Sequence, residues 1–130
     1  MLQDDAEAVT WYRLAAAQGF ATAQYNLGLM CANGEGVPQD YAEAVTWYRL
    51  AAEQGYAEAQ SNLGLMYANG EGVPQDDITA QMWLNLAAAN GHQEANAKRD
   101  EVAARMAAAD ISEAQRRATL CLASTYQDCD

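Results

Sequence analysis

The sequence predicts an all-α solenoid, and three observations carry this prediction. Two consecutive units, Asp4–Gln39 and Asp40–Gln75, agree at 30 of their 36 positions. The tryptophans Trp11, Trp47 and Trp83 keep the same 36-residue register. No run of the chain alternates apolar and polar residues over the length of a strand. A repeat of this period is typical of stacked helical units, each of which buries its apolar face against its neighbours.

The first helix is expected over residues 4–18. Asp4 is a suitable N-cap, because its carboxylate accepts the free backbone N–H groups of the first turn. Gly19 follows the helix, at the place where a left-handed residue commonly ends one. The residues at helical spacing that form its apolar face are Ala8, Trp11, Tyr12 and Ala15.

A second helix is expected from Ala21 to about Asn33. Gly28 lies inside this helix and Gly64 inside its copy, although glycine destabilises a helix by about 1 kcal/mol relative to alanine. We infer that a neighbouring helix approaches too closely for a side chain. Two glycines and a proline then end the helix, and Asp40 caps the next one. The buried face of this second helix should contain Ala23, Leu27, Met30 and Cys31.

Later units repeat these helices with increasing change. The charged run at residues 98–101 gives the last unit the polar outer side that the end of a solenoid needs. The last helix should turn Ile111, Ala114, Ala118, Cys121 and Leu122 inward. The predicted solenoid spans residues 1–125, with a lone helix at 4–18 and helix pairs at 21–54, 57–90 and 93–124, and residues 126–130 are expected to form a loose tail.

The N-terminal end has no comparable polar cap. Residues 1–8 align with residues 37–44 of the next unit, so the chain starts within a repeat. The first helix also keeps the full apolar pattern of an internal unit. We therefore expect upstream sequence, or a second copy of the chain in a homodimer, to cover this end.

The net charge of −11 is unevenly distributed. Residues 1–97 carry two arginines and 12 acidic residues, whereas residues 98–130 carry five basic and six acidic residues. This distribution argues against nucleic acid and anionic membrane surfaces as partners, because both require clustered basic residues. It permits a neutral or basic partner. No apolar run reaches 18 residues, so no membrane insertion is expected.

The three cysteines lack the spacing of metal ligands, and no metal or other cofactor is expected. Cys31 replaces Tyr67 of the next unit and should be a buried, inert thiol. Cys121 and Cys129 have two alternatives. They form a disulfide that pins the tail if the compartment is oxidising, or they remain free thiols.

The repeat carries the pattern A-x-A-Q-x-N-L-G-x-M-Y-x-N-G-x-G-V-P-x-D-Y-x-x-A-x-x-W-Y-x-x-A-A-x-Q-G, which resembles the Sel1-like repeat, a relative of the tetratricopeptide repeat. The resemblance implies a right-handed superhelix of antiparallel helix pairs. The Leu-Gly helix of each pair is helix A, and the Trp-Tyr helix is helix B. The chain is then a lone helix B followed by three A–B pairs, or about seven helices.

The resemblance also implies that relatives bind peptides or proteins on a concave surface lined by the A helices. Asn26 and Asn62 suit a peptide backbone, because an amide both donates and accepts hydrogen bonds. The alternative for both is a hydrogen bond to the backbone of the neighbouring repeat. Lys98 continues this row and suits a carboxylate. The positions carried over are Thr22, Tyr25, Asn26, Leu29, Asn33, Glu58, Ser61, Asn62, Leu65, Asn69, Glu94, Ala97, Lys98 and Glu101.

A carboxylate clamp like that of tetratricopeptide relatives fits this row poorly. Tyr25 and Leu29 stand where the clamp has lysine and asparagine, and Glu94 stands where it has lysine. Such an acidic groove favours a neutral or basic segment.

The leading hypothesis for function is therefore a non-catalytic module or scaffold that binds a protein or peptide. The alternative is a self-associating structural fragment of a larger solenoid protein. An enzyme ranks a distant third, because His92 is the one histidine and no Ser/His/Asp or Cys/His group can be assembled.

Overall fold

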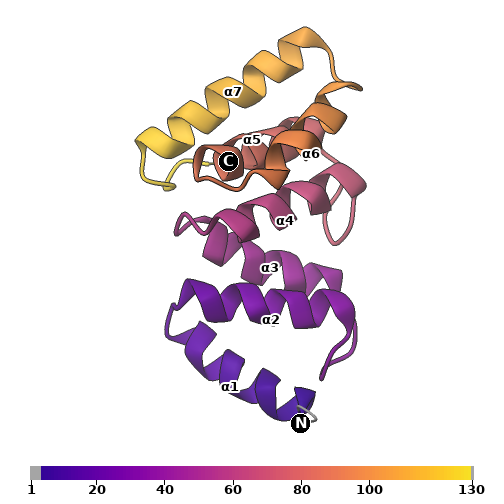
Figure 1. The fold of residues 1–130 in the computed structure, drawn as a ribbon, viewed down its shortest axis with the longest axis vertical. Helices are drawn as coiled ribbons and strands as arrows, with labels where there is room; N and C mark the ends of the chain where they lie inside the picture. Colours follow the sequence, from indigo (N-terminus) through magenta and orange to yellow (C-terminus); the bar gives the residue numbers. More distant parts are fainter. Residues whose placement is uncertain (1–3, 130) are drawn as a thin grey trace.

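The computed structural model describes residues 4–129, and this part of the chain forms seven α-helices and no strand (Figure 1). The predicted spans 1–125 and 126–130 extend outside the described residues at positions 1–3 and 130. The helices are α1 (Asp5–Ala17), α2 (Ala21–Asn33), α3 (Tyr41–Ala52), α4 (Ala57–Asn69), α5 (Asp77–Ala89), α6 (Glu94–Ala103) and α7 (Ala108–Ala123).

Aspartates at equivalent positions begin three of the helices. The carboxylate of Asp4 accepts hydrogen bonds from the backbone N–H groups of Ala6 and Glu7. Asp40 and Asp76 cap α3 and α5 in the same way, each through the backbone N–H three residues on. Each cap satisfies backbone donors that the first turn leaves without a partner inside the helix. The expectation that Asp4 and Asp40 act as N-caps is confirmed.

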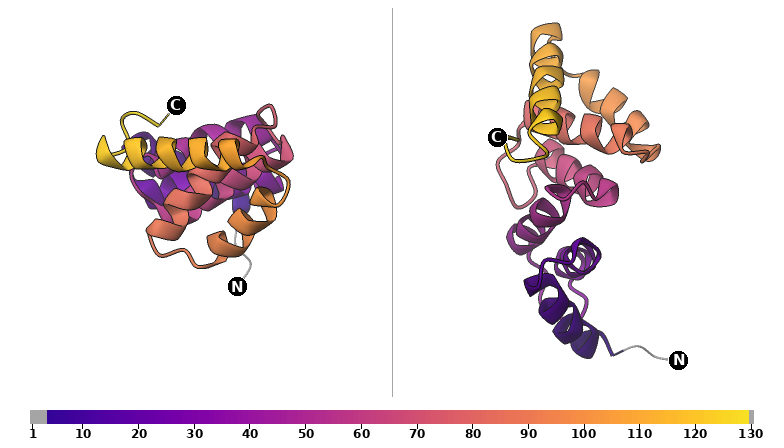
Figure 2. Two further views of the ribbon diagram at one scale, coloured as in Figure 1. Left: turned by 90° about the horizontal axis from the view of Figure 1, so that it is seen from above. Right: turned by 90° about the vertical axis from the view of Figure 1, so that its left-hand side faces the viewer.

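The helices from α1 to α6 pack in chain order, each against the next, and form an elongated stack (Figure 2). Helices α2, α4 and α6 lie toward the viewer in Figure 1, with α3 and α5 behind them. The structure therefore separates the A helices and the B helices onto two sides of the stack. No helix within residues 4–129 is long and apolar enough to cross a membrane.

Close approach of helices explains the two helix glycines, as expected. A Cβ atom built on Gly28 would lie 2.6 Å from a ring carbon of Tyr48 on α3. A Cβ atom on Gly64 would lie 2.9 Å from Cγ of Leu84 and 3.0 Å from the backbone oxygen of Ala80, both on α5. Gly28 and Gly64 therefore let α2 and α4 each sit directly against the B helix that follows.

Buried glutamines join α1 to α2 and α3 to α4, a feature the sequence prediction missed. Gln24 is 4% exposed and donates its side-chain N–H to the backbone oxygen of Ala16, at 3.2 Å. Gln60 is fully buried and makes the same bond to Ala52, at 3.0 Å. The amide of Gln54 in turn donates to Gln24, and that of Asn90 to Gln60. These bonds satisfy polar groups that burial would otherwise leave unpaired.

The C-terminal helix departs from the repeat. The sequence predicts that residues 93–124 form a helix pair, but α7 packs against α5 and makes only marginal contact with α6. Ala114, Ala118 and Cys121 turn inward as expected, whereas the inward placement of Leu122 is wrong, since it is 49% exposed. The small inward residues let α7 lie close to α5.

The segment after α7 folds back along the stack instead of forming a loose tail (Figure 1). A disulfide joins Cys121 to Cys129, which is 7% exposed. The hydroxyl of Tyr126 accepts a hydrogen bond from the Asn90 amide at 2.9 Å. Its ring lies near Gly55, in the turn between α3 and α4. The described residues 126–129 are thus part of the fold.

Cys31 is a free, fully buried thiol, as expected. Burial, and then the nearby negative charge of Glu43, raises the pKa of Cys31 to about 11. The thiol is therefore protonated at neutral pH and a poor nucleophile.

Candidate functional site

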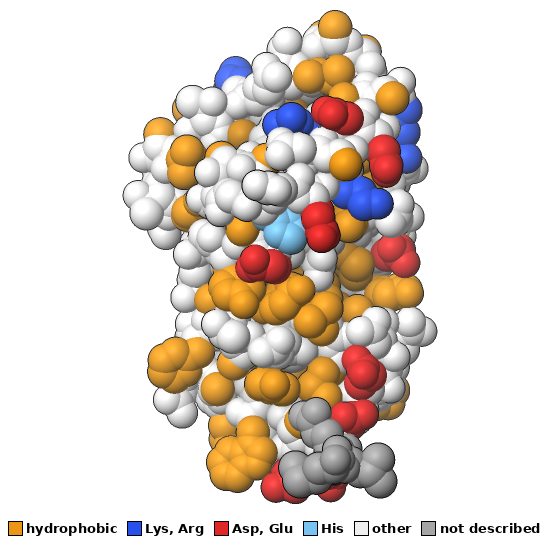
Figure 3. Space-filling model, in the orientation of Figure 1, with side chains coloured by type: hydrophobic (Ala, Val, Ile, Leu, Met, Phe, Trp, Pro, Cys, Tyr) orange, Lys and Arg blue, Asp and Glu red, His pale blue; other side chains and the backbone are white. Residues whose placement is uncertain are grey.

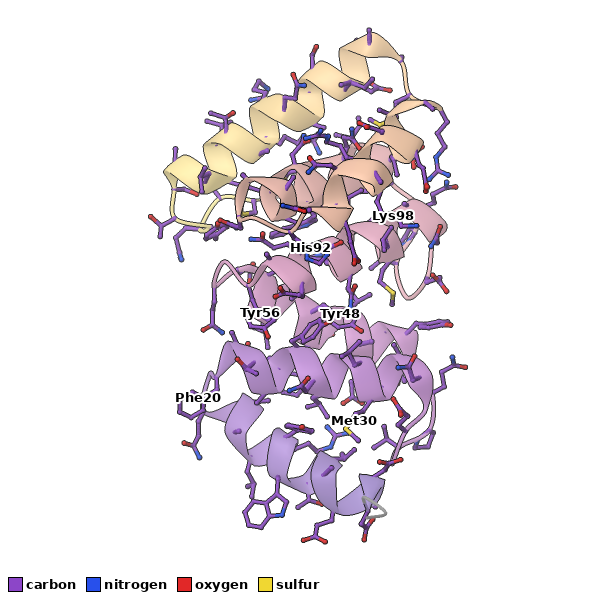
Figure 4. The ribbon with its side chains drawn as sticks, in the orientation of Figure 1. Phe20, Met30, Tyr48, Tyr56, His92 and Lys98 are labelled. Atoms are coloured by element: carbon purple, nitrogen blue, oxygen red, sulfur yellow. A yellow bond between two sulfur atoms is a disulfide. The ribbon has the colours of Figure 1, made fainter. Side chains whose placement is uncertain are left out.

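The surface presented by α2, α4 and α6 is named the A face here, and it is the side seen in Figure 3. A band of hydrophobic side chains crosses its middle, and acidic side chains and the single histidine border this band. Figure 4 places Tyr56 and Tyr48 between α2 and α4, with His92 above them. The A face therefore combines an apolar centre with an acidic surround.

The predicted binding residues differ in how far they are available on this face. Ser61 is an exception among them, because it is only 3% exposed and cannot line a groove. Tyr25, Asn26, Leu29, Asn62 and Leu65 are half-buried. Thr22, Asn33, Glu58, Asn69, Glu94, Ala97, Lys98 and Glu101 are exposed.

Three tyrosines pack together at the junction of the first two A helices. The ring centroids of Tyr25 and Tyr56 lie 5.2 Å apart, and those of Tyr25 and Tyr48 lie 6.0 Å apart. Such tilted arrangements are favourable for aromatic rings. Tyr48 is 2% exposed, and burial raises its pKa to about 12. Tyr48 is thus the buried member of the cluster, whereas Tyr25 and Tyr56 remain partly open to solvent.

Asn62 is occupied by this tyrosine cluster. Burial raises the pKa of Tyr25 and of Tyr48, and the side chain of Asn62 acts in the opposite direction on both. The predicted alternatives were a bound peptide and the backbone of a neighbouring repeat. The structure adds a third neighbour for this amide, the hydroxyls of the tyrosine cluster.

Charged side chains surround the cluster. Glu58 lies in the first turn of α4, two residues after Tyr56, and its side chain is 48% exposed. Burial, and then the charge of Glu58, raises the pKa of Tyr25. The Nδ1 atom of His92 lies 4.0 Å from the carboxylate of Glu58. A negative charge is therefore held beside a partly open aromatic surface.

Three other polar residues of the predicted row have partners of their own. Lys98 lies 3.8 Å from the carboxylate of Glu101, one turn along α6. Asn33 donates to the side chain of Glu35 at 3.2 Å. Asn69 makes the equivalent bond to Glu71 at 3.3 Å. These two asparagines stabilise the loops after α2 and α4.

A shallow pocket of about 180 Å³ opens at the N-terminal end of the A face. Asn26 and Leu29, both predicted binding residues, contribute to its wall. The pocket is lined by Asp5, Tyr12, Asn26, Leu29, Met30 and Glu35. Acidic side chains therefore border this hollow as well as the tyrosine cluster.

A second exposed surface lies on α1 and the turn after it. Trp11 is 64% exposed, Leu14 is 54% exposed and Phe20 is 59% exposed. The inward placement predicted for Trp11 is therefore wrong within this chain. Figure 4 shows Phe20 pointing away from the stack. Three large apolar side chains on one end are a surface that a partner could cover.

No cluster of metal-ligating side chains accompanies these surfaces in the described part of the chain. Among residues 4–129, no three His, Cys, Asp or Glu side chains gather closely enough to hold a metal ion. His92 faces Glu58, and the free thiol of Cys31 is buried. The sequence prediction omitted Tyr56 and His92 from the site, although both stand at the repeat position that Phe20 occupies first.

Known proteins place this geometry in context. The model of the Sel1 repeat family matches residues 1–20, 21–56 and 57–92. A protective antigen of uropathogenic Escherichia coli strains that displays an SLR fold is 31% identical, with a TM-score of 0.89 over 95% of this chain. A Sel1 repeat protein from Oxalobacter formigenes is 39% identical, with a TM-score of 0.73 over 76% of this chain. The matches cover 28% and 41% of those two chains, respectively. No curated protein matches the chain.

Proposed function

Because the chain belongs to the Sel1 repeat family, we propose that it is a non-catalytic module that binds an extended peptide or protein segment on its A face. The observation that carries this proposal is the half-exposed apolar band on that face, to which Tyr25, Tyr56, Leu29 and Leu65 contribute. Partly exposed aromatic side chains in a packed setting supply much of the binding energy at protein interfaces.

Charge selects among possible partners. Glu58, Glu94 and Glu101 are exposed acidic residues of the A helices, and Lys98 is already paired with Glu101. A neutral or basic segment suits this surface, since an acidic one would meet like charges. The binding of a basic segment should therefore weaken as salt screens these carboxylates.

Selection of peptides from a random-sequence display library tests the proposal. Peptides that bind the immobilised chain are synthesised, and their dissociation constants are measured by isothermal titration calorimetry. We expect Leu65→Lys on α4 to weaken binding about tenfold or more, because it places a charge in the apolar band. Leu50→Lys is the matched control, since Leu50 is 41% exposed on α3, a B helix.

Two results would contradict the proposal. One is a library that yields no binding peptide. The other is a set of peptides that lose affinity with Leu50→Lys and keep it with Leu65→Lys. Circular dichroism melting of both variants distinguishes lost binding from lost folding.

Self-association is a second candidate function, and the exposed Trp11, Leu14 and Phe20 specifically favour it. A second copy of the chain that covered α1 would bury three large apolar side chains, which is a favourable change. Light scattering coupled to size exclusion, over a wide concentration range, measures this directly. A concentration-dependent dimer that Leu14→Lys abolishes would support it, and a monomer at every concentration would exclude it.

A further inference from the structure

The two most similar repeats differ at only six of 36 positions, and three of the residues involved meet at one place. Tyr25 of the first unit corresponds to Ser61 of the second, and Tyr56 and Glu58 of the second replace Phe20 and Thr22 of the first. The remaining differences are Asp5 for Tyr41, Ala17 for Glu53 and Cys31 for Tyr67. Since the solenoid tolerates either residue at each position, packing alone does not require this combination.

The junction between α2 and α4 brings these three side chains together. The rings of Tyr25 and Tyr56 lie 5.2 Å apart with an interplanar angle of 39°. Glu58 follows Tyr56 by two residues and acts electrostatically on Tyr25. Figure 4 shows Tyr56 on the A face in the gap between the two helices. Two partly open rings and one exposed carboxylate therefore share a small area.

The next junction, between α4 and α6, lacks this arrangement. Its residues at the positions of Tyr25, Tyr56 and Glu58 are Ser61, His92 and Glu94. Ser61 is buried and supplies no ring. The carboxylate of Glu94 is thus present without an aromatic surface beside it, which makes this junction an internal control.

We propose that Tyr25, Tyr56 and Glu58 form a subsite for an arginine side chain of the segment that binds the A face. This inference rests on the function proposed above and adds the chemistry of one partner residue. A guanidinium stacks on aromatic rings and at the same time donates paired hydrogen bonds to a carboxylate. The acidic balance of residues 1–97 attracts a cation to the same place.

Arginine suits the geometry better than lysine. The guanidinium is planar, so it can lie against a tyrosine ring while its edge faces the carboxylate. An ammonium group is a compact, strongly hydrated charge that gains less from the ring faces. The Nδ1 atom of His92 lies 4.0 Å from the carboxylate of Glu58, which is beyond hydrogen-bonding distance.

A blocked Gly-Gly-Arg-Gly-Gly pentapeptide is a suitable probe, titrated into the isotope-labelled chain and followed by NMR. The same peptide with citrulline in place of arginine has nearly the same shape without the charge. We expect saturable shifts at Tyr25, Tyr56 and Glu58 with the arginine peptide. The citrulline peptide should bind about tenfold more weakly, because it loses the ion pair and the cation–π contact.

A second test uses variants in which a residue is replaced by the one at the equivalent position of another repeat. Glu58→Thr and Tyr25→Ser each introduce the residue that an equivalent repeat position already carries. Each should weaken the arginine peptide about tenfold, whereas Glu94→Thr, the matched control at the next junction, should leave it unchanged. Equal binding of citrulline, or equal effects of Glu58→Thr and Glu94→Thr, would overturn the subsite.

The outcomes separate this inference from the function proposed above. Library peptides that map to the A face but contain no arginine and tolerate Glu58→Thr would leave the binding module standing and reject the subsite. Specific binding of the arginine probe, with library peptides that map to another face, would show that these residues bind a guanidinium but would reject the A face as the surface for the segment.

Discussion

Trp11 and Trp83 occupy the same position of the repeat but lie in opposite environments. Trp11 on α1 is 64% exposed, whereas Trp83 on α5 is fully buried. Helix α5 packs against α4, α6 and α7, whereas α1 packs mainly against α2. A helical apolar pattern therefore specifies which face can be buried. Whether that face is buried depends on how many neighbours the fold supplies.

The two ends of the stack also differ in how they are fastened. The C-terminal end has a disulfide and a returning segment that contacts α5 and the turn before α4. At the N-terminal end, an ion pair from Arg13 to Glu43, at 2.9 Å, ties α1 to α3. We therefore expect α1 to open first and the region around α5 to open last, because local stability follows the number of packed neighbours.

Replacing each tryptophan by alanine gives the largest expected contrast. Trp83→Ala should lower the free energy of unfolding by about 3–5 kcal/mol, since it leaves a cavity in a packed core. Trp11→Ala should change it by less than about 1 kcal/mol, because the side chain is mostly in water. Urea denaturation followed by circular dichroism measures both values. Equal losses would mean that α1 is covered in solution and would contradict the difference in burial between Trp11 and Trp83.

Removing the disulfide tests the fastening of the C-terminal end. The double variant Cys121→Ala, Cys129→Ala should lose about 2.5 kcal/mol, the loop-closure term for two cysteines eight residues apart. Urea denaturation of the oxidised chain and the variant gives this difference. Reductant should destabilise the natural chain and leave the variant unchanged, because the remaining Cys31 is a free, buried thiol. Insensitivity of the natural chain to reductant would contradict the role of the bridge.

The two helix glycines compare packing in successive repeats. Gly28→Ala and Gly64→Ala should each destabilise the fold by about 1–3 kcal/mol through overpacking, despite the better helix propensity of alanine. Gly64→Ala should be the worse change, because a backbone oxygen stands 3.0 Å from the new Cβ atom. Thermal unfolding of the two variants ranks them. A stabilised Gly28→Ala would show that Tyr48 and α3 move aside easily near the N-terminal end.

The ion pair at the N-terminal end should give the smallest effect. A hydrogen bond from Arg13, then one from Trp47, lowers the pKa of Glu43 below its ordinary value of 4.5. The stability that this shift contributes is present above pH 4.5 and is lost as pH falls through the lowered pKa. Arg13→Gln should raise the pKa of Glu43 and lower stability at neutral pH by about 0.2–1 kcal/mol.

Carboxyl titration by NMR measures the pKa of Glu43 in both chains. Urea denaturation at neutral and acidic pH then shows whether the difference in stability disappears when Glu43 is protonated. An unchanged pKa in Arg13→Gln would contradict the role of Arg13 in the ionisation of Glu43.

Much of the fold was predictable from the sequence because its signals are local. The aspartate caps need only a carboxylate three residues before a free N–H, as Asp40 provides for Glu43. Gly28 and Gly64 indicate close helix packing, although the sequence does not identify the neighbouring helix. The position of α7 was not predictable, because its apolar stripe fits any neighbouring apolar face.

The candidate site was less predictable than the fold. Tyr25 and Glu58 were among the expected residues, but Tyr56 was not, and the spacing did not indicate that Asn62 would influence the pKa of two tyrosines. Ser61 occupies the position of Tyr25 and is nevertheless buried. Contacts between successive repeats decide these outcomes, and they depend on side chains 30 or so residues apart.

The sequence by itself determined the helices, their caps and the repeat family, since these depend on backbone hydrogen bonding and on periodicity within one unit. Only the tertiary structure decided which copy of each repeated residue is buried, as the contrast between Trp11 and Trp83 shows. It also brought together Tyr25, Tyr56 and Glu58, which stand at three of the positions where the repeats differ. The physical reason is that burial and proximity arise from neighbours, and identical units at different places in a stack have different neighbours.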